Sequence, residues 1–142
     1  MRETAGANEV IEAYTAAVRA KDVEAFLALY ADDVRSFDLW SVWSYDGKDA
    51  YRAMVEEWLG SPDTAAQVVV EFDEVRVEEG DGVAAVSAFL TFRGLNADGV
   101  EERWMNNRLT WILRRDGDTW KIVHEHTSAP AGDEGKVSLR RS

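Results

Sequence analysis

The chain contains no cysteine and only two histidines among its 142 residues. The absence of cysteine excludes disulfides, thiolate nucleophiles and zinc sites held by cysteine. No apolar run approaches the roughly 20 residues that a membrane-spanning helix requires. The N-terminal residues MRETAGANEV lack the apolar stretch of a signal peptide, so we expect a cytoplasmic protein.

Basic residues are scarce as well. The 16 Lys and Arg stand against 27 Asp and Glu, which gives a net charge of −11. Such an excess repels nucleic-acid phosphates and anionic lipid, so we expect neither a nucleic acid nor a membrane as a partner. Hydrophobic residues, in contrast, make up 46% of the chain and aromatic residues 11%. This is enough apolar material for the core of one domain.

Hydrophobic periodicity predicts helices first and strands afterwards. Helical spacing covers residues 8–20, a second helix starts after a cap at Asp22 and extends to Tyr30, and a third covers residues 49–59. A short strand at 34–39 and an aromatic loop precede the third helix. Strands follow at 67–79, 83–93, 101–115 and 120–128. A shift of the apolar phase in the first of these four strands predicts a β-bulge near Asp73 and Glu74.

This order predicts an α+β fold, in which three N-terminal helices pack on one face of a strongly curved, mostly antiparallel sheet. A bent sheet with helices across its mouth leaves a cone-shaped pocket between the two layers. We expect one domain over residues 1–130, and a flexible tail over residues 131–142.

Two parts of the chain resemble the NTF2-like superfamily, especially its SnoaL-like and ketosteroid-isomerase-like branches. The first part is YTAAVRAKDVEAFLALYADDV with the FDLW and YDGKDAYRAMVEEWL that follow; the second is RLTWILRRDGDTWKIVHEHTSAP. The resemblance covers residues 8–130 and implies the cone fold and a homodimer. The superfamily contains isomerases, cyclases, dehydratases, hydrolases and non-catalytic hubs, so the resemblance selects no single reaction. We expect the dimer contact on the outer sheet face, at Met105, Leu109 and Trp111.

The resemblance also implies roles for two residues. Tyr14 in AYTAAV and Asp38 in SFDL match positions of the isomerase branch. There the aspartate abstracts a proton next to a ketone, and the tyrosine donates a hydrogen bond to the developing oxyanion. The second oxyanion donor of that branch, a protonated acid, has no counterpart in NNRLTWILRR, where Asn106 or Thr110 would replace it.

The register of the last hairpin decides where His124 and His126 point. The two residues share one face of a strand. A three-residue loop at 116–118 places them beside Asn106, Arg108 and Thr110, and we favour this register because it gathers polar groups. A two-residue loop turns the histidines to the other face of the sheet. If the polar face looks outward instead, it is a partly solvated surface or a dimer contact.

In the favoured arrangement both imidazoles look into the cone. We then expect His124 or His126 to relay a proton or orient Asp38, and Arg108 to bind a ligand carboxylate or Asp38 itself. A metal would need a third ligand, but Pro130 and Ala131 stand where cupin-like spacing requires a glutamate. Phosphate loops and dinucleotide fingerprints are missing, and we predict no metal and no other cofactor.

Aromatic side chains complete the predicted site. Trp40 and Trp43 lie in the loop between a strand and a helix, where they can roof an apolar pocket, and we expect Trp58, Trp104 and Phe89 on its walls. These residues favour a small, apolar or cyclic ligand. The leading hypothesis is a ligand-binding domain with cofactor-independent acid–base chemistry of the isomerase, cyclase, dehydratase or hydrolase type. The alternative is a non-catalytic dimerisation or ligand-binding module.

Overall fold

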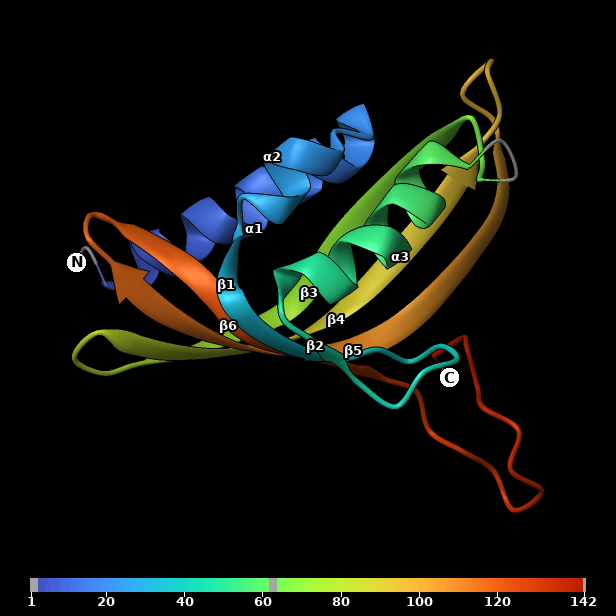
Figure 1. Cartoon of the computed structure of the whole chain (residues 1–142). Helices are drawn as coiled ribbons and strands as arrows, with labels where there is room; N and C mark the ends of the chain where they lie inside the picture. The colour runs from blue at the N-terminus through green and yellow to red at the C-terminus, as the bar shows by residue number, and fades with distance from the viewer. Residues whose placement is uncertain (1–2, 62–63, 142) are drawn as a thin grey trace.

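The computed structural model describes residues 3–61 and 64–141, which form three helices and one six-stranded sheet (Figure 1). The helices are α1 (Glu3–Ala20), α2 (Val23–Leu27) and α3 (Lys48–Gly60). The strands are β1 (Tyr30–Phe37), β2 (Tyr45–Asp46), β3 (Gln67–Glu79), β4 (Val83–Leu95), β5 (Glu101–Asp116) and β6 (Thr119–Ser128). The α+β class and the order of elements agree with the prediction.

Local sequence sets the ends of the short helix α2. Asp22 is its N-cap, and the Asp22 carboxylate accepts a hydrogen bond of 3.0 Å from the backbone N–H of Ala25. The helix ends earlier than predicted, because Leu29 accepts a hydrogen bond of 2.8 Å from the backbone N–H of Ile122. Tyr30 therefore begins β1 and does not continue the helix.

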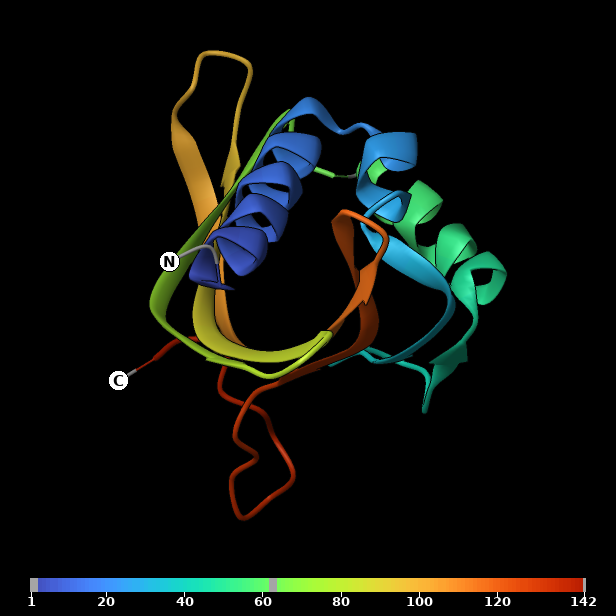
Figure 2. The same ribbon diagram turned by 90° about the vertical axis from the view of Figure 1, so that its left-hand side faces the viewer.

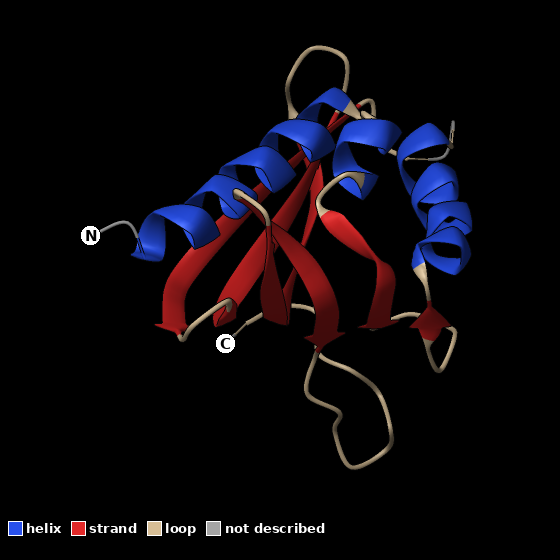
Figure 3. Ribbon diagram, turned by 60° about the vertical axis from the view of Figure 1, so that its left-hand side comes forward, coloured by secondary structure: helices blue, strands red, loops and turns tan. Residues whose placement is uncertain are grey.

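The sheet has the order β2-β1-β6-β5-β4-β3, and β1 and β6 are parallel while the other neighbours are antiparallel. It bends strongly around the space below the helices (Figures 2 and 3). The bulge predicted in β3 is confirmed, because the pairing with β4 shifts between Asp73 and Arg76, and Glu74 has a φ of 51°. This bulge adds to the bend of the strand.

The hairpin between β5 and β6 differs from the favoured register. Asp116 pairs with Thr119, so the loop has two residues and not three. A second irregularity lies in β6, where Ile122 pairs with Leu113 but His124 pairs with Ile112. The extra residue, Val123, shifts the register once more. The histidines consequently lie beside Thr110 and its neighbours as predicted, but on the face that points away from the helices, called the outer face below.

The core lies between the helices and the inner face of the sheet. Tyr14 of α1 packs against Phe26 and Trp111, with ring centroids 4.9 and 5.5 Å apart. Leu109 and Trp111 are buried in this core. The expectation that they form a dimer contact is wrong, because the odd-numbered residues of β5 face inward. The homodimer itself stays a prediction.

The segment after β6 folds back along the outer side of β5, seen as the red loop below the sheet in Figure 1. The backbone N–H of Asn106 donates a hydrogen bond of 2.6 Å to the carbonyl of Leu139. The guanidinium groups of Arg140 and Arg141 lie 4.3 and 4.2 Å from the ring centroids of Trp104 and Phe89. The segment predicted as a tail thus contacts the sheet. Within residues 3–61 and 64–141, no helix is long and apolar enough to cross a membrane.

Candidate functional site

A cavity of about 810 Å³ lies between α1, α3, the loop after β1 and the inner face of the sheet. Its apolar lining includes Trp40, Tyr45, Met54, Trp58, Phe92 and Trp104. Its polar lining includes Tyr14, Asp38, Tyr51, Asn107, Glu125 and Thr127. The structure therefore brings together five of the predicted site residues: Tyr14, Asp38, Trp40, Trp58 and Trp104. An aromatic wall with a few converging polar groups is typical of a small-molecule site.

Glu125 is the most buried acid of this cavity, with 2% of its surface exposed. Its carboxylate accepts hydrogen bonds from the hydroxyls of Tyr30 at 2.7 Å and Tyr51 at 2.6 Å, and from Nε1 of Trp111 at 2.8 Å. Burial raises the pKa of Glu125, and these three donors offset only part of that rise. Neutral donors therefore replace the water that the carboxylate loses.

Glu125 is not among the residues predicted from the sequence, because the prediction placed the two flanking histidines inside the cone. The strand alternates, so the face that takes His124 and His126 cannot take Glu125. The apolar face of β5, which includes Leu109 and Trp111, was the signal that could have found it. That face is the inner one, and Glu125 pairs with Trp111 on it.

Asp38 follows the end of β1 at the edge of the cavity. Its Oδ2 accepts a hydrogen bond of 3.2 Å from the backbone N–H of Trp40, and its Oδ1 accepts one of 3.3 Å from the Thr127 hydroxyl. Thr127 in turn accepts a hydrogen bond of 2.9 Å from the backbone N–H of Leu39. Burial raises the pKa of Asp38, although these hydrogen bonds oppose the shift. A half-buried carboxylate with a raised pKa has the properties of a general base.

Tyr14 is 4% exposed and lines the cavity. Burial raises the pKa of Tyr14 well above 10, and the charges of Glu125 and Asp38 raise it further. The hydroxyl thus keeps its proton at neutral pH and remains a donor. Its electrostatic coupling to both acids places the three groups in one region of the cavity.

His124 and His126 lie on the outer face, and the expectation that their rings look into the cone is wrong. Nδ1 of His124 lies 2.8 Å from the carbonyl oxygen of Arg35. The ring of Phe37 contacts both imidazoles edge-on, at centroid distances of 4.9 and 5.5 Å. The physical reason is that the apolar face of β5, with Leu109 and Trp111, is the inner one, so Glu125 lies inside beside Trp111 and the flanking histidines lie outside. The outward alternative, a partly solvated surface, describes this arrangement.

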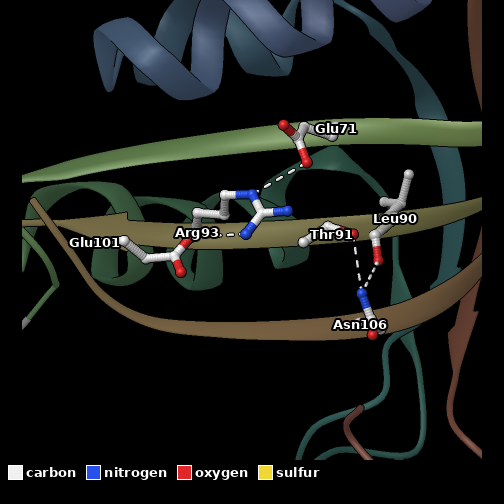
Figure 4. Close-up of polar contacts among 6 residues, drawn as sticks. All are labelled: Glu71, Leu90, Thr91, Arg93, Glu101 and Asn106. Carbon is white, nitrogen blue, oxygen red and sulfur yellow. Dashed lines mark hydrogen bonds and ion pairs between the residues drawn. The ribbon is translucent and has the colours of Figure 1, made fainter. Parts of the chain in front are cut away.

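The predicted polar ligand-binding residues of β5 also lie outside the cavity. Arg108 is exposed and donates a hydrogen bond of 3.0 Å to the Ser128 hydroxyl, and Thr110 is exposed beside it. Asn106 donates a hydrogen bond of 2.9 Å to the Thr91 hydroxyl (Figure 4). Nearby, the Arg93 guanidinium forms ion pairs with Glu71 and Glu101. Arg108, Thr110 and Asn106 are not among the residues that line the cavity.

Two predicted aromatic residues are likewise absent from the lining. Trp43 is 96% exposed at the tip of the loop between β1 and β2, whereas its neighbour Trp40 reaches the cavity. Phe89 lies on the outer face under the guanidinium of Arg141. Trp40 therefore contributes to the cavity wall, whereas Trp43 and Phe89 do not.

Asn107 is a further residue that the sequence analysis did not identify. It pairs with Leu90 across β4 and β5, lines the cavity and is 8% exposed. Its Oδ1 is buried and has no hydrogen-bond partner among the described residues. Leaving a buried polar atom without a partner is costly, and the buried hydroxyl of Ser36 shares this feature with Asn107.

The arrangement can support acid–base chemistry in an apolar enclosure. Asp38 supplies a carboxylate that can take a proton, and Tyr14 supplies a hydroxyl that can donate to an oxygen. In the part of the chain that the structure describes, no cluster of three or more His, Asp and Glu side chains is placed to hold a metal ion.

The chain belongs to the SnoaL-like domain family, whose model matches residues 7–132. The fold is that of the NTF2-like superfamily. An NTF2-like protein of unknown function from Pseudomonas putida KT2440 is 28% identical, with a TM-score of 0.83 over 98% of this chain and 96% of that one. No curated protein matches the chain.

Two solved structures of lower sequence identity share the fold, although they are named as different kinds of protein. A candidate scytalone dehydratase from Novosphingobium aromaticivorans DSM 12444 is 12% identical, with a TM-score of 0.77 over 98% of this chain and 94% of that one. A candidate calcium/calmodulin-dependent protein kinase II association domain from Xanthomonas campestris is 18% identical, with a TM-score of 0.73 over 87% and 85%. At these identities the likeness concerns the fold alone.

Proposed function

We propose that this SnoaL-like domain binds a small, mostly apolar, cyclic ligand in the cavity and catalyses proton abstraction next to its carbonyl group, without a cofactor. Asp38 is the base and Tyr14 the donor to the developing oxyanion. The observation that carries the proposal is the placement of these two groups in one aromatic cavity, where burial raises the pKa of both. This pairing of a carboxylate base with a tyrosine donor favours enolisation.

The raised pKa values serve the two roles in different ways. Asp38 becomes a stronger base because burial raises its pKa above the ordinary value. Tyr14 keeps its proton, so its hydroxyl can donate a hydrogen bond to a ligand oxygen. Glu125 acts as a positioning residue, since it fixes the rings of Tyr30, Tyr51 and Trp111 beside the cavity.

We propose a class of reactions and not one particular activity. Isomerisation, cyclisation and dehydration of a cyclic ketone can all begin with loss of a proton next to the carbonyl, and the dehydratase-like neighbour has the same fold. His124, His126 and Arg108 have no part in the proposal, because they lie on the outer face.

Hydrogen exchange of a model ketone tests the proposal without knowledge of the natural substrate. β-Tetralone is incubated in deuterium oxide with the protein, and the loss of its α-proton signals is followed by NMR. We expect the wild type to accelerate exchange over buffer. Asp38→Asn should reduce the protein-dependent rate by about 10²-fold or more, and Tyr14→Phe by about 10²-fold.

The matched control is Asp46→Asn, which removes an exposed carboxylate that pairs with Arg35 at 2.9 Å, outside the cavity lining. This variant should exchange β-tetralone as the wild type does. If Asp38→Asn retains the wild-type rate, or if the wild type gives no acceleration at all, the catalytic proposal is wrong.

A specific observation also supports a second candidate, a non-catalytic ligand-binding module. The Glu125 carboxylate is fully supplied with donors, as a structural network requires. The two candidates predict different outcomes for a ligand such as β-naphthol. A binding module binds it without exchanging β-tetralone, whereas an enzyme of the proposed class does both.

A further inference from the structure

We infer that Arg140 is a positioning residue for ligand binding, because its guanidinium holds the ring of Trp104 in the wall of the cavity. The inference rests on the proposed use of the cavity as a binding site. It gives a role to the segment after β6, which lies along the outer side of β5 and restrains one aromatic side chain that the ligand contacts.

The contact between Arg140 and Trp104 is the starting observation. The guanidinium carbon of Arg140 lies 4.3 Å from the centroid of the Trp104 ring. This separation is within the roughly 6 Å over which an aromatic face attracts a cation. Trp104 lines the cavity, whereas Arg140 does not. The guanidinium therefore reaches the indole from outside the cavity and restricts its orientation without contacting a ligand.

Three further contacts fix the segment that carries Arg140. The backbone N–H of Asn106 donates a hydrogen bond of 2.6 Å to the carbonyl of Leu139. The backbone N–H of Arg141 donates one of 2.8 Å to Oδ1 of Asn106, and the Arg141 guanidinium pairs with the Glu74 carboxylate at 2.6 Å. These contacts lie on both sides of Arg140 in the sequence, so they hold its backbone against the sheet.

The restraint matters because the fold leaves Trp104 only partly supported. In the described part of the chain, Trp104 is half-buried and, unlike Trp58, is not among the aromatic residues packed against the hydrophobic core. Ordering a mobile side chain when a ligand binds costs free energy, and that cost lowers the affinity. A ring that is already held in place avoids the cost, so Arg140 raises the affinity of the cavity through Trp104.

Arg141 provides the comparison that tests this role. Both arginines are exposed, and the Arg141 guanidinium lies 4.2 Å from the ring centroid of Phe89, almost the same distance as in the Arg140 contact. Phe89 does not line the cavity, whereas Trp104 does. If the segment only stabilises the fold, neither arginine affects ligand binding. If Arg140 positions Trp104, the loss of Arg140 alone weakens binding.

The first measurement is fluorine NMR of protein labelled with fluorotryptophan, which reports on each of the six tryptophans. Trp104→Phe identifies the Trp104 resonance. Added β-naphthol should shift this resonance but not that of Trp43, which is 96% exposed and does not line the cavity. In the unliganded protein, Arg140→Ala should shift or broaden the Trp104 resonance, whereas Arg141→Ala should leave it unchanged.

The second measurement is the affinity of the same variants for β-naphthol by calorimetry. Arg140→Ala should weaken binding about fivefold, because the ligand must then order the indole. Arg140→Lys keeps a cation and should recover part of the loss. Arg141→Ala should bind as tightly as the wild type, even if loss of its pair with Glu74 lowers the melting temperature. In a Trp104→Leu background, Arg140→Ala should not weaken binding further, because Arg140 acts through that ring.

The outcomes separate this inference from the proposed function. If β-naphthol does not bind the wild type, ligand binding in the cavity fails, and the role of Arg140 fails with it. If β-naphthol binds but Arg140→Ala leaves either the affinity or the Trp104 resonance unchanged, the inference is wrong while the proposed function stands. The same conclusion follows if Arg141→Ala weakens binding equally, or if the effect of Arg140→Ala persists in the Trp104→Leu background.

Discussion

The hydroxyl of Tyr51 donates a hydrogen bond of 2.6 Å to Oε1 of Glu125. It joins α3 to β6 inside the core and couples the helix that walls the cavity to the strand that forms its floor. A bond of this kind replaces hydration of a buried carboxylate, so its loss leaves a charge that is incompletely solvated. The polar interior of the cone thus depends on tyrosines that come from different elements.

The first prediction compares two buried tyrosines. Tyr51→Phe should lower the free energy of unfolding by about 2 kcal/mol, because it removes a donor to a buried charged group. Tyr14→Phe should change it by no more than about 0.5 kcal/mol, since burial and charge, and no hydrogen bond, shift the pKa of Tyr14. Urea unfolding of the two variants measures the difference. Equal destabilisation would mean that the Tyr14 hydroxyl belongs to the same structural network.

The second prediction concerns the pH dependence of stability. The pKa of Glu125 in the folded state is raised above its ordinary value of 4.5, mainly by burial. The unfolded chain therefore loses this proton first, and the contribution of Glu125 to stability is present below pH 4.5 and is lost as the pH rises through the folded-state pKa. Glu125→Gln cannot titrate, so its stability relative to the wild type should rise over the same pH range.

Urea unfolding at several values between about pH 4 and pH 8 tests this difference. Glu24→Gln is the control with the opposite sign, because the hydrogen bond and charge of Arg52 lower the pKa of Glu24. The exposed ion pair of Glu24 with Arg52 stabilises the fold above the ordinary pKa of Glu24. This contribution is lost as the pH falls through the lowered pKa, and solvent screening keeps it small. If the stability of Glu125→Gln relative to the wild type stays constant or falls as the pH rises, the fold stabilises the charged form of the Glu125 carboxylate.

Hydrophobic periodicity was sufficient to predict most of the fold. The alternation in β3 even located the bulge at Asp73 and Glu74, because a change of apolar phase has few other causes. The sequence did not reveal the parallel pairing of β1 with β6, since it joins segments almost a hundred residues apart. It also gave no signal for the short strand β2, whose two residues are set by their neighbours.

The site was less predictable, because the face of a strand depends on every extra residue before it. Tyr14 and Asp38 were found through their resemblance to the isomerase branch. The error at His124 and His126 came from assigning the polar face of β5 to the cone, whereas its apolar face, with Leu109 and Trp111, is the buried one. Asn107 was overlooked because Asn106 beside it was assigned to the cavity, and the choice between adjacent asparagines depends on the same register.

The third prediction addresses the two histidines directly. His126→Gln and His124→Gln should exchange β-tetralone at the wild-type rate within about twofold, because both side chains lie on the outer face. His124→Gln should have the larger effect on melting temperature, since His124 lies within hydrogen-bond distance of the Arg35 carbonyl. A loss of exchange in either variant, without a loss of folding, would return that histidine to the reaction.

The last prediction uses two glycines in helices. In general, replacing helical glycine by alanine stabilises a protein by up to about 1 kcal/mol. Gly60 follows this rule, because a Cβ there meets no atom within 4 Å. At Gly6 a Cβ would overlap the indole of Trp120, so α1 and β6 would have to separate. Gly6→Ala should therefore lower the free energy of unfolding by about 1–3 kcal/mol, while Gly60→Ala raises it or leaves it unchanged. Urea unfolding distinguishes the two, and a stabilised Gly6→Ala would show that α1 does not pack closely on Trp120 at this point.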